Sequence, residues 1–387
     1  MNPQTHYIDS AGNLQALCTR IRHKTWLALD TEFIRESTYY PRLCLLQLAT
    51  DDTIACVDPL ALPSLEPLLE LLFEPGIVKV FHACSQDMEI FYHACGRLPQ
   101  PVFDTQLAAP LLGLPSQPGY ASLVQELLGT TLSKSHTRTD WSRRPLSSQQ
   151  LAYALDDVRY LGPLYLKLRA ALEERGRLAW LQEDFAALSD PERYRNPPEQ
   201  AWRRIRSTGK LTGRRLAALK ALAAWREKRA QQEDRPRGWL LPDETLVDIA
   251  RMSPADTEQL ASLRSVKRQA VKDYGVEILA LIRQAETAPA PDAEPADERA
   301  GPLEARQEAL VDIMMALVRL RGAENAINPA LLASRDELAR LILGQADVEL
   351  LHGWKKNLIG DDLLRLLQGR LRLRVEHGTP RFDPADS

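Results

Sequence analysis

Several features of membrane and secreted proteins are missing from this chain of 387 residues. No apolar run approaches the roughly 20 residues that a transmembrane helix needs, which excludes a helical membrane protein. The first residues lack a basic segment followed by an apolar one, so we expect no secretory signal peptide. The five cysteines form no C-x-x-C pair, which indicates reduced thiols in a cytoplasmic protein and argues against zinc.

Charge is distributed unevenly along the chain. Residues 196–240 contain 12 Lys and Arg but 4 Asp and Glu, a local net charge of +8. Because the whole chain carries −3, the remainder carries −11. This separation predicts a nucleic-acid-facing surface in the basic segment and metal-binding carboxylates elsewhere. A solvated helix face is the alternative explanation for the basic segment.

The pattern of apolar residues predicts an α/β domain over residues 1–190. Short apolar segments typical of strands lie at Trp26–Asp30, Leu43–Ala49, Thr53–Val57 and Ile77–Phe81. Helical spacing is found at Leu65–Phe73, Ser85–Cys95, Ser122–Leu128 and Leu151–Arg175. Turn residues between the first three strands predict a meander within a central sheet.

After residue 195 the sequence has few of the short apolar segments that are typical of strands. Residues 196–286 are predicted to form a helical domain, with helices at Trp202–Ser207, Gly213–Arg229, Asp243–Arg251, Pro254–Leu263 and Val266–Glu286. A proline-rich acidic linker is predicted at 287–302. A second domain at 303–380 is predicted to be helical to about residue 375. Leu240-Leu241 recurs 91 residues later as Leu331-Leu332, and a second short string recurs at the same offset, as a duplicated module requires.

Two acids, Asp30 and Glu32, end the apolar segment that begins at Trp26. Residues i and i+2 of a strand project from the same face, so the two carboxylates are expected to lie side by side. Partial burial makes such a pair of like charges unfavourable. A bound divalent cation is the simplest arrangement that stabilises it.

A third acid, Asp87, follows the strand predicted at Ile77–Phe81. It falls in the first turn of a helix that Ser85 is expected to cap. An acid in a first turn complements the helix dipole, which is the alternative to a functional role.

The first two turns of the helix predicted at Leu151–Arg175 contain a tyrosine and two adjacent acids. A capping-box pattern, Ser-x-x-Gln, precedes it at 147–150. Tyr153 and Asp157 are four residues apart and share the edge of the apolar arc, whereas Asp156 falls on the polar side. Asp157 is therefore predicted to point inward. A buried hydrogen bond between Tyr153 and Asp157, without a catalytic role, is the alternative.

Together these positions resemble the three motifs of the DEDD 3′→5′ exonucleases. LALDTEF contains Asp30 and Glu32, Asp87 follows a strand, and Tyr153-x-x-x-Asp157 has the tyrosine of the DEDDy branch. More narrowly, FIRESTYYPRLCLLQLA, FDTQLAA and TRTDWSRRPLS are similar to the ribonuclease D family. Residues 197–286 resemble an HRDC domain, notably in AWREKRA and LLPDETLVDIA, and residues 303–375 resemble a second, diverged one.

The resemblance implies a fold, a reaction and a cofactor. It implies an α/β ribonuclease-H-like domain with a mixed central sheet, followed by two all-α HRDC-like domains. It implies a 3′→5′ exoribonuclease that releases nucleoside 5′-monophosphates with two Mg²⁺ or Mn²⁺ ions. The metal ligands would be Asp30, Glu32, Asp87 and Asp157, with Glu32 and Tyr153 catalytic; we assign Tyr153 to orienting the attacking water. The implied substrate is RNA with a single-stranded 3′ tail, such as a tRNA precursor.

Contacts with the nucleic acid are expected in two places. Beside the acids they are Thr31, Phe33, His82 and Gln86. Core packing for Phe33, and hydrogen bonding to local backbone for His82 and Gln86, are the alternatives. In the basic segment, contacts are expected from Arg203, Arg204 and Lys210, which can neutralise phosphates without reading sequence.

Two other functions are compatible with the same motifs. A 3′→5′ DNA exonuclease has the same acids, because the distinction depends on contacts to the 2′-hydroxyl. A nucleic-acid-binding adaptor on an inactive nuclease scaffold is the third hypothesis, although all five motif positions are intact here.

Overall fold

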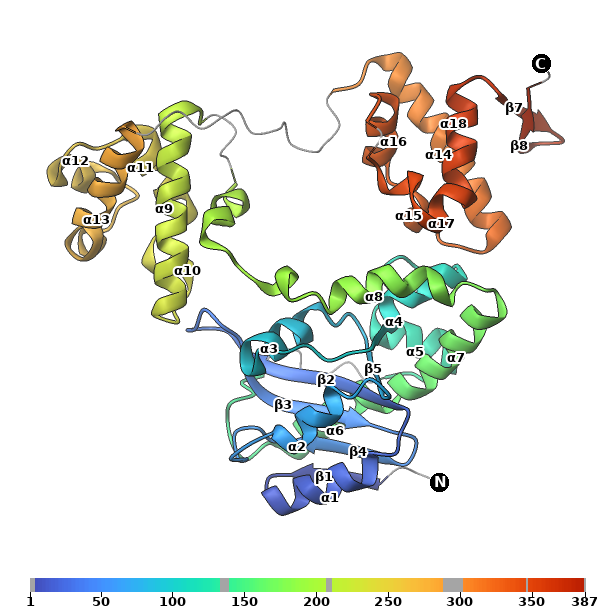
Figure 1. Ribbon diagram of the computed structural model, residues 1–387, viewed down its shortest axis with the longest axis horizontal. Helices are drawn as coiled ribbons and strands as arrows, with labels where there is room; N and C mark the ends of the chain where they lie inside the picture. The colour runs from blue at the N-terminus through green and yellow to red at the C-terminus, as the bar shows by residue number, and fades with distance from the viewer. Residues whose placement is uncertain (1–3, 133–138, 207–210, 288–301, 346, 386–387) are drawn as a thin grey trace.

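The computed structural model describes residues 4–132, 139–206, 211–287, 302–345 and 347–385. The described N-terminal part is an α/β domain with a six-stranded sheet in the order β1-β4-β3-β2-β5-β6 (Figure 1). The strands are β1 (Gln4–Ile8), β2 (Trp26–Ile34), β3 (Arg42–Ala49), β4 (Thr53–Val57), β5 (Val78–Phe81) and β6 (Val102–Asp104). The pairs β2–β3 and β3–β4 are antiparallel and the other pairs are parallel, so the predicted meander and mixed sheet are confirmed.

Helices cover both faces of the sheet, which is why its central strands are apolar on both sides. One face packs against α1 (Ala11–Ile21), α2 (Glu66–Leu72) and α3 (Ser85–Cys95). The other face packs against α4 (Thr105–Ala108), η1 (Ala109–Leu112), α5 (Tyr120–Leu128), α6 (Ser148–Arg159) and α7 (Leu161–Glu174). Residues 43–49 of β3 are buried throughout.

Several local features of this domain differ from the sequence predictions. The single helix predicted at Leu151–Arg175 is divided at Tyr160 into α6 and α7. Pro163 lies in the first turn of α7, where its missing N–H is tolerated, but its ring would clash with a continuous helix. Strands β1 and β6 were not predicted, since β6 has only three residues and β1 is a largely polar edge strand.

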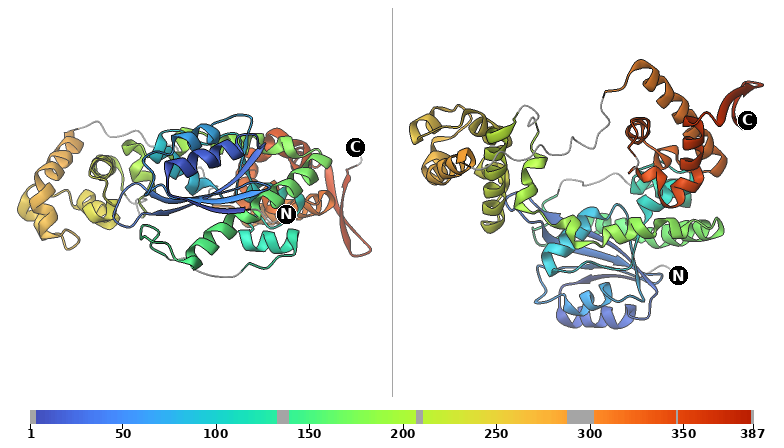
Figure 2. Two further views of the ribbon diagram at one scale, coloured as in Figure 1. Left: turned by 90° about the horizontal axis from the view of Figure 1, so that it is seen from below. Right: turned by 45° about the horizontal axis from the view of Figure 1, so that its top comes forward.

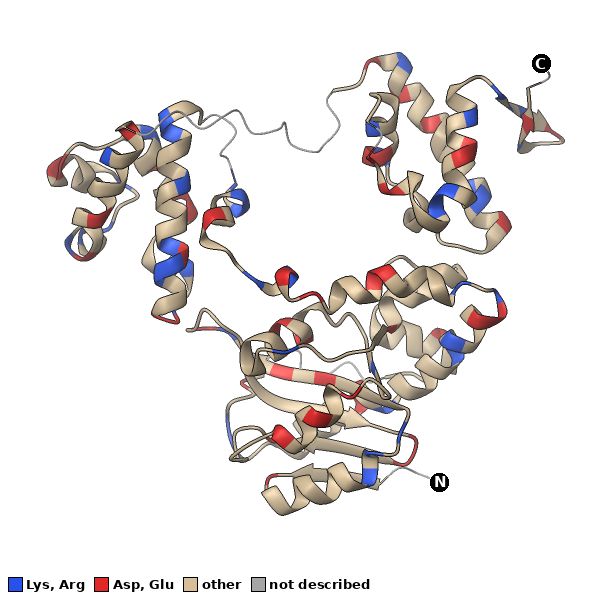
Figure 3. Cartoon of the chain, in the orientation of Figure 1, with Lys and Arg blue, Asp and Glu red and all other residues tan. Residues whose placement is uncertain are grey.

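The first helical block, residues 198–287 where described, follows a connection formed by η2 (Leu178–Leu181), α8 (Gln182–Leu188) and η3 (Pro191–Tyr194). The block consists of η4 (Pro198–Arg204), α9 (Gly213–Gln232), α10 (Arg237–Leu240), α11 (Asp243–Met252), α12 (Thr257–Ser262) and α13 (Arg268–Thr287). The segment predicted as a helix at Trp202–Ser207 is a 3₁₀ helix that begins earlier and ends at Arg204. Blue segments in Figure 3 show Lys and Arg along α9.

The second helical block begins at α14 (Ala305–Asn325) and repeats part of this order. It continues with α15 (Pro329–Leu332), α16 (Arg335–Ile342), η5 (Glu349–Leu351), α17 (Gly353–Lys355), η6 (Lys356–Gly360) and α18 (Asp361–Leu367). Both blocks thus have a long helix, a four-residue helix and a medium helix in succession. The chain then forms an antiparallel hairpin, β7 (Leu371–Glu376) and β8 (Thr379–Pro384), where helix had been expected to about residue 375.

Residues 288–301, which are nearly all of the linker predicted at 287–302, lie outside the described residues. In the part of the chain that is described, no helix is both long and apolar enough to cross a membrane.

The first helical block docks on the connection between β2 and β3. Tyr39 is 6% exposed, packs with Ala230 and Leu240, and donates its hydroxyl hydrogen to the buried carboxylate of Glu227. The Asp234 carboxylate accepts the N–H groups of Tyr39 and Tyr40, each at 3.0 Å. A segment continuous with β2 therefore forms the joint with α9 and α10.

The second helical block contacts a different part of the N-terminal domain, and the two blocks lie apart in both views of Figure 2. The Arg177 guanidinium donates to the carbonyl of Leu111 at 2.7 Å and to that of Asn325 at 2.5 Å. Trp180 stacks on Trp354, with ring centroids 4.6 Å apart and planes 4° from parallel. Specific polar and aromatic contacts thus hold this block on the α/β domain.

Candidate active site and metal centre

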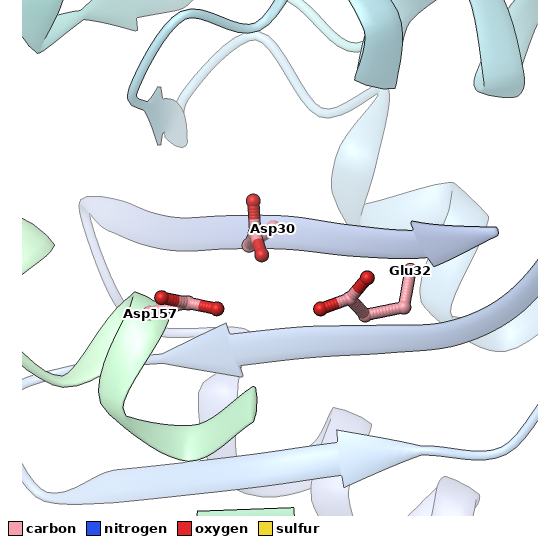
Figure 4. A group of neighbouring side chains, drawn as sticks. All are labelled: Asp30, Glu32 and Asp157. Atoms are coloured by element: carbon pink, nitrogen blue, oxygen red, sulfur yellow. The ribbon is translucent and has the colours of Figure 1, made fainter. Parts of the chain in front are cut away.

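Three carboxylates converge on one face of the sheet. Asp30 and Glu32 project from β2, and Asp157 projects toward them from α6 (Figure 4). One oxygen from each residue lies within 4.8 Å of the others. This carboxylate cluster offers only hard oxygen ligands, the type that Mg²⁺ and Mn²⁺ prefer. The donor set therefore fits the divalent cation that the sequence predicts.

The local folds that build the cluster follow from the sequence. Asp30 and Glu32 share a face of β2, and α6 packs across that face through Ala154 and Val158. The predicted capping box is present: the Ser147 hydroxyl accepts from the backbone of Gln150, whose side chain accepts from the backbone of Ser147.

Asp156 and Asp157 are separated as the helical arc predicts. Asp157 joins the carboxylate cluster, while Asp156 accepts a hydrogen bond of 2.9 Å from Arg159 on the outer side of α6.

The electrostatics of the cluster favour protons or cations. Burial, followed by the charge of Asp157, raises the pKa of Asp30 to about 8. Burial and then the charge of Asp30 raise the pKa of Glu32 to about 9. Burial raises the pKa of Asp157 to about 7. Without a cation, three ionised carboxylates are unfavourable here at neutral pH.

Asp87 lies beside the cluster but outside its set of three carboxylates. It is in the first turn of α3, is 7% exposed, and accepts a hydrogen bond of 2.6 Å from the Thr31 hydroxyl. Burial, and then the charge of Asp30, raises the pKa of Asp87 well above its ordinary value. The Thr31 hydroxyl thus positions Asp87, and an RNA contact by Thr31 stays a prediction.

The start of α3 differs from the prediction, and the Asp104 carboxylate holds the turn that precedes it. Cys84 is the N-cap residue of α3, without a capping side chain of its own. The Asp104 carboxylate accepts the N–H groups of Ala83 at 3.0 Å and Cys84 at 2.8 Å. The predicted Ser85 cap is wrong, because Ser85 is already the first residue of the helix and Cys84 occupies the N-cap position. Asp104, in FDTQLAA, thereby fixes the turn that carries Asp87.

Tyr153 lies one helical turn before Asp157 and packs against Trp141, with ring centroids 6.2 Å apart. Burial, followed by the charge of Asp157, raises the pKa of its hydroxyl above 10. The phenol therefore stays protonated at neutral pH and can donate a hydrogen bond, but is a poor base.

The other predicted residues near the acids have mixed surroundings. Phe33 is half-buried and Gln86 is exposed. The His82 Nδ1 lies 2.9 Å from the Thr105 hydroxyl, and burial lowers the pKa of this imidazole. The Tyr120 hydroxyl, which the sequence did not single out, donates to the carbonyl of Asp156 at 3.0 Å and so supports α6.

Arg203 and Arg204, two of the three predicted basic contacts, lie on η4, at the base of the first helical block. Arg203 is exposed, with its guanidinium 5.9 Å from the centre of the Trp202 ring. Arg204 forms an ion pair of 3.5 Å with the buried Glu227 and so contributes to the interdomain joint. Lys210 lies outside the described residues.

Comparisons with known proteins agree with these features. Residues 5–173 match the 3′-5′ exonuclease family model, and residues 215–282 match the HRDC domain model. A ribonuclease D of Granulibacter bethesdensis is 43% identical, with 97% of this chain and 95% of the relative covered. A ribonuclease D of Gluconacetobacter diazotrophicus is 41% identical, with 99% and 98% covered.

Among solved structures, the chain is similar to Escherichia coli RNase D, an exoribonuclease involved in structured RNA processing. The TM-score is 0.81 at 34% identity, with 95% of this chain and 99% of that chain covered. The predicted fold class, an α/β exonuclease domain followed by helical HRDC architecture, is confirmed. The chain belongs to the ribonuclease D family of 3′→5′ exoribonucleases.

Proposed function

We propose that the chain shortens RNA from single-stranded 3′ tails, releasing nucleoside 5′-monophosphates, and that tRNA precursors and other stable RNAs are its substrates. The observation that carries the proposal is the convergence of Asp30, Glu32 and Asp157 beside Asp87. The relatives are named ribonucleases, which favours RNA over DNA as the substrate.

We further propose that the site binds two divalent ions. Asp30, Glu32 and Asp157 would hold them, with support from Asp87. When bound, such ions supply charge neutralisation for the attacking and leaving oxygens of an in-line phosphodiester displacement. The protein contributes a rigid strand and helix that fix the carboxylates. The protonated Tyr153 hydroxyl, beside Asp157, orients the attacking water by hydrogen bonding.

The proposal is tested with a 5′-labelled RNA hairpin that carries a 3′ tail, in Mg²⁺ or Mn²⁺. Stepwise shortening with release of 5′-monophosphates is expected, and a circular RNA of the same sequence should resist. A DNA strand of matched sequence provides the comparison. Faster cleavage of the DNA would reassign the enzyme to DNA, and internal cleavage of the circle would refute the exonucleolytic mode.

Tyr153→Phe is expected to lower kcat by about 100-fold, the range typical of one positioned proton-handling group. The ring and its packing on Trp141 are retained, so the Mn²⁺ affinity and the KM for RNA should stay within about threefold of wild type. Single-turnover hydrolysis and calorimetric Mn²⁺ titration measure the two effects. A wild-type kcat would remove the assigned role.

We further propose the domain limits 1–190, 196–286 and 303–380, with the last domain a diverged HRDC-like module after the linker at 287–302. The repeated order of long, four-residue and medium helices supports this assignment. Because the first block carries the basic segment, we propose that it binds the RNA backbone ahead of the active site.

Arg203→Ala is expected to weaken binding of a long 3′-tailed RNA and to leave a trinucleotide substrate unaffected. The binding constant of a single strand falls with salt, and each lost phosphate contact reduces the magnitude of the slope of log K against log salt by about 0.7. Fluorescence anisotropy between 50 and 200 mM salt gives this slope. An unchanged slope would exclude Arg203 from the RNA interface.

A further inference from the structure

One polar side chain interrupts the apolar strand β3. Residues 43–49 read Leu-Cys-Leu-Leu-Gln-Leu-Ala, and the glutamine, Gln47, is 0% exposed. A glutamine is rarely buried completely without hydrogen bonds, because its carboxamide has two donors and an acceptor to satisfy. Its presence in the centre of the sheet therefore calls for a local reason.

The strand register places Gln47 next to the carboxylate cluster. Its Cα partner on β2 is Asp30, and its Cα partner on β4 is Cys56. Cross-strand partners project from the same face, with Cβ atoms about 4.5–5.5 Å apart. The carboxamide thus lies on the face of the sheet that holds Asp30 and Glu32, beneath α6.

The carboxamide has no hydrogen-bond partner within the described part of the chain, at either Oε1 or Nε2. Its neighbour Asp30 receives a backbone hydrogen bond from Thr31 and has further acceptor capacity on its carboxylate. Cys56 is a buried thiol, which is only a weak donor. Asp30 is therefore the stronger of the two cross-strand partners available to the amide N–H groups.

We propose that Gln47 is a positioning residue for the metal centre: when the carboxylate cluster binds a divalent cation, the Gln47 amide donates a hydrogen bond to the ionised Asp30 carboxylate and fixes its orientation toward the ion. The inference rests on the proposed function, because it requires that the carboxylate cluster binds such an ion. Hydrogen bonds of this kind to ligating groups typically change metal affinity by about 10–100-fold.

Gln47→Met tests the proposal, because methionine keeps the unbranched shape and removes the amide. The Mn²⁺ affinity, measured by calorimetry, is expected to fall at least about tenfold. The kcat on 3′-tailed RNA should fall with it, whereas the KM for RNA should stay within about twofold. The thermal stability of the metal-free variant should equal or exceed that of wild type, because an unpartnered polar group is replaced by an apolar one.

A structural role alone would give a different pattern. If Gln47→Met gains stability but binds Mn²⁺ within twofold of wild type, the proposal is overturned. Ser265→Ala is the control, since the Ser265 hydroxyl is also buried without a partner among the described residues but lies in the first helical block. It should leave Mn²⁺ affinity unchanged.

The wild-type protein provides a second readout that does not depend on how the variant folds. The side-chain amide resonance of Gln47, in protein labelled with ¹⁵N-glutamine, is expected to shift on addition of Mg²⁺. A resonance that does not move while Mg²⁺ saturates the site would contradict the proposal. Failure of the wild-type protein to bind Mg²⁺ or Mn²⁺ would instead refute the proposed function on which it rests.

Discussion

Asp30→Asn is expected to lower kcat/KM for 3′-tailed RNA by at least about 10³-fold, or about 4 kcal/mol of transition-state stabilisation. Asp30 is the central acid of the cluster, near Glu32, Asp87 and Asp157. Replacing its carboxylate with an amide removes a metal ligand while keeping the shape of the side chain. Single-turnover hydrolysis at saturating Mg²⁺ measures the loss.

The same substitution should stabilise the metal-free protein at pH 8. It removes one of the charges that raise the pKa of Glu32 and Asp87, so the cluster loses an unfavourable interaction. Each kcal/mol gained would raise Tm by about 2–4 °C for a domain of this size. Loss of activity together with a higher Tm in EDTA distinguishes a removed metal ligand from a damaged fold.

Asp156→Asn is the matched control. It makes the same chemical change at the residue before Asp157, but Asp156 pairs with Arg159 outside the cluster. Activity within about threefold of wild type is expected. If Asp156→Asn were as damaging as Asp30→Asn, charge at α6 in general, and not the carboxylate cluster, would explain the effect.

Metal affinity is expected to depend steeply on pH, rising at least about 100-fold between pH 6 and pH 8, since each proton displaced contributes a factor of ten per pH unit below its pKa. At pH 6 the cluster holds protons, because burial raises the pKa of Asp157 to about 7, of Asp30 to about 8 and of Glu32 to about 9. Calorimetric Mn²⁺ titrations in two buffers of different ionisation enthalpy count the protons released. A flat affinity without proton release would contradict the prediction.

Stability without metal should change in the opposite direction. The folded-state pKa values of these acids lie above their unfolded values near 4, so the folded state binds more protons between about pH 4 and pH 9. The free energy of unfolding therefore falls as pH rises through this window. Bound cations reverse the loss, so the increase in Tm caused by Mn²⁺ over EDTA should be larger at pH 8.5 than at pH 5.5.

Local patterns predicted the features that depend on local chemistry. The meander of β2, β3 and β4 followed from short apolar segments between turns, and the choice of Asp157 over Asp156 followed from helical periodicity. The features that were missed depend on tertiary contacts. Asp104, on β6, accepts the N–H groups of Ala83 and Cys84 just before α3, and no spacing rule connects it to these residues.

Gln47 illustrates the same limit within the site. In the sequence, Gln47 is a single polar residue within an apolar segment. Only the strand register shows that it is the cross-strand partner of Asp30. The break between α6 and α7 was different in kind, because Pro163 was visible in the sequence as a barrier to a continuous helix.

The joint at Tyr39 has a practical consequence for anyone who shortens this protein. Cutting the chain after the exonuclease domain would strip Glu227, Asp234 and Ala230 from Tyr39. A buried aromatic ring and two backbone N–H groups would then face water, on a segment that leads directly into the strand bearing Asp30 and Glu32. In the isolated catalytic fragment, the β2–β3 connection would expose apolar surface and lose its hydrogen bonds to the first helical block. The kinetics of this fragment would therefore not represent those of the intact enzyme.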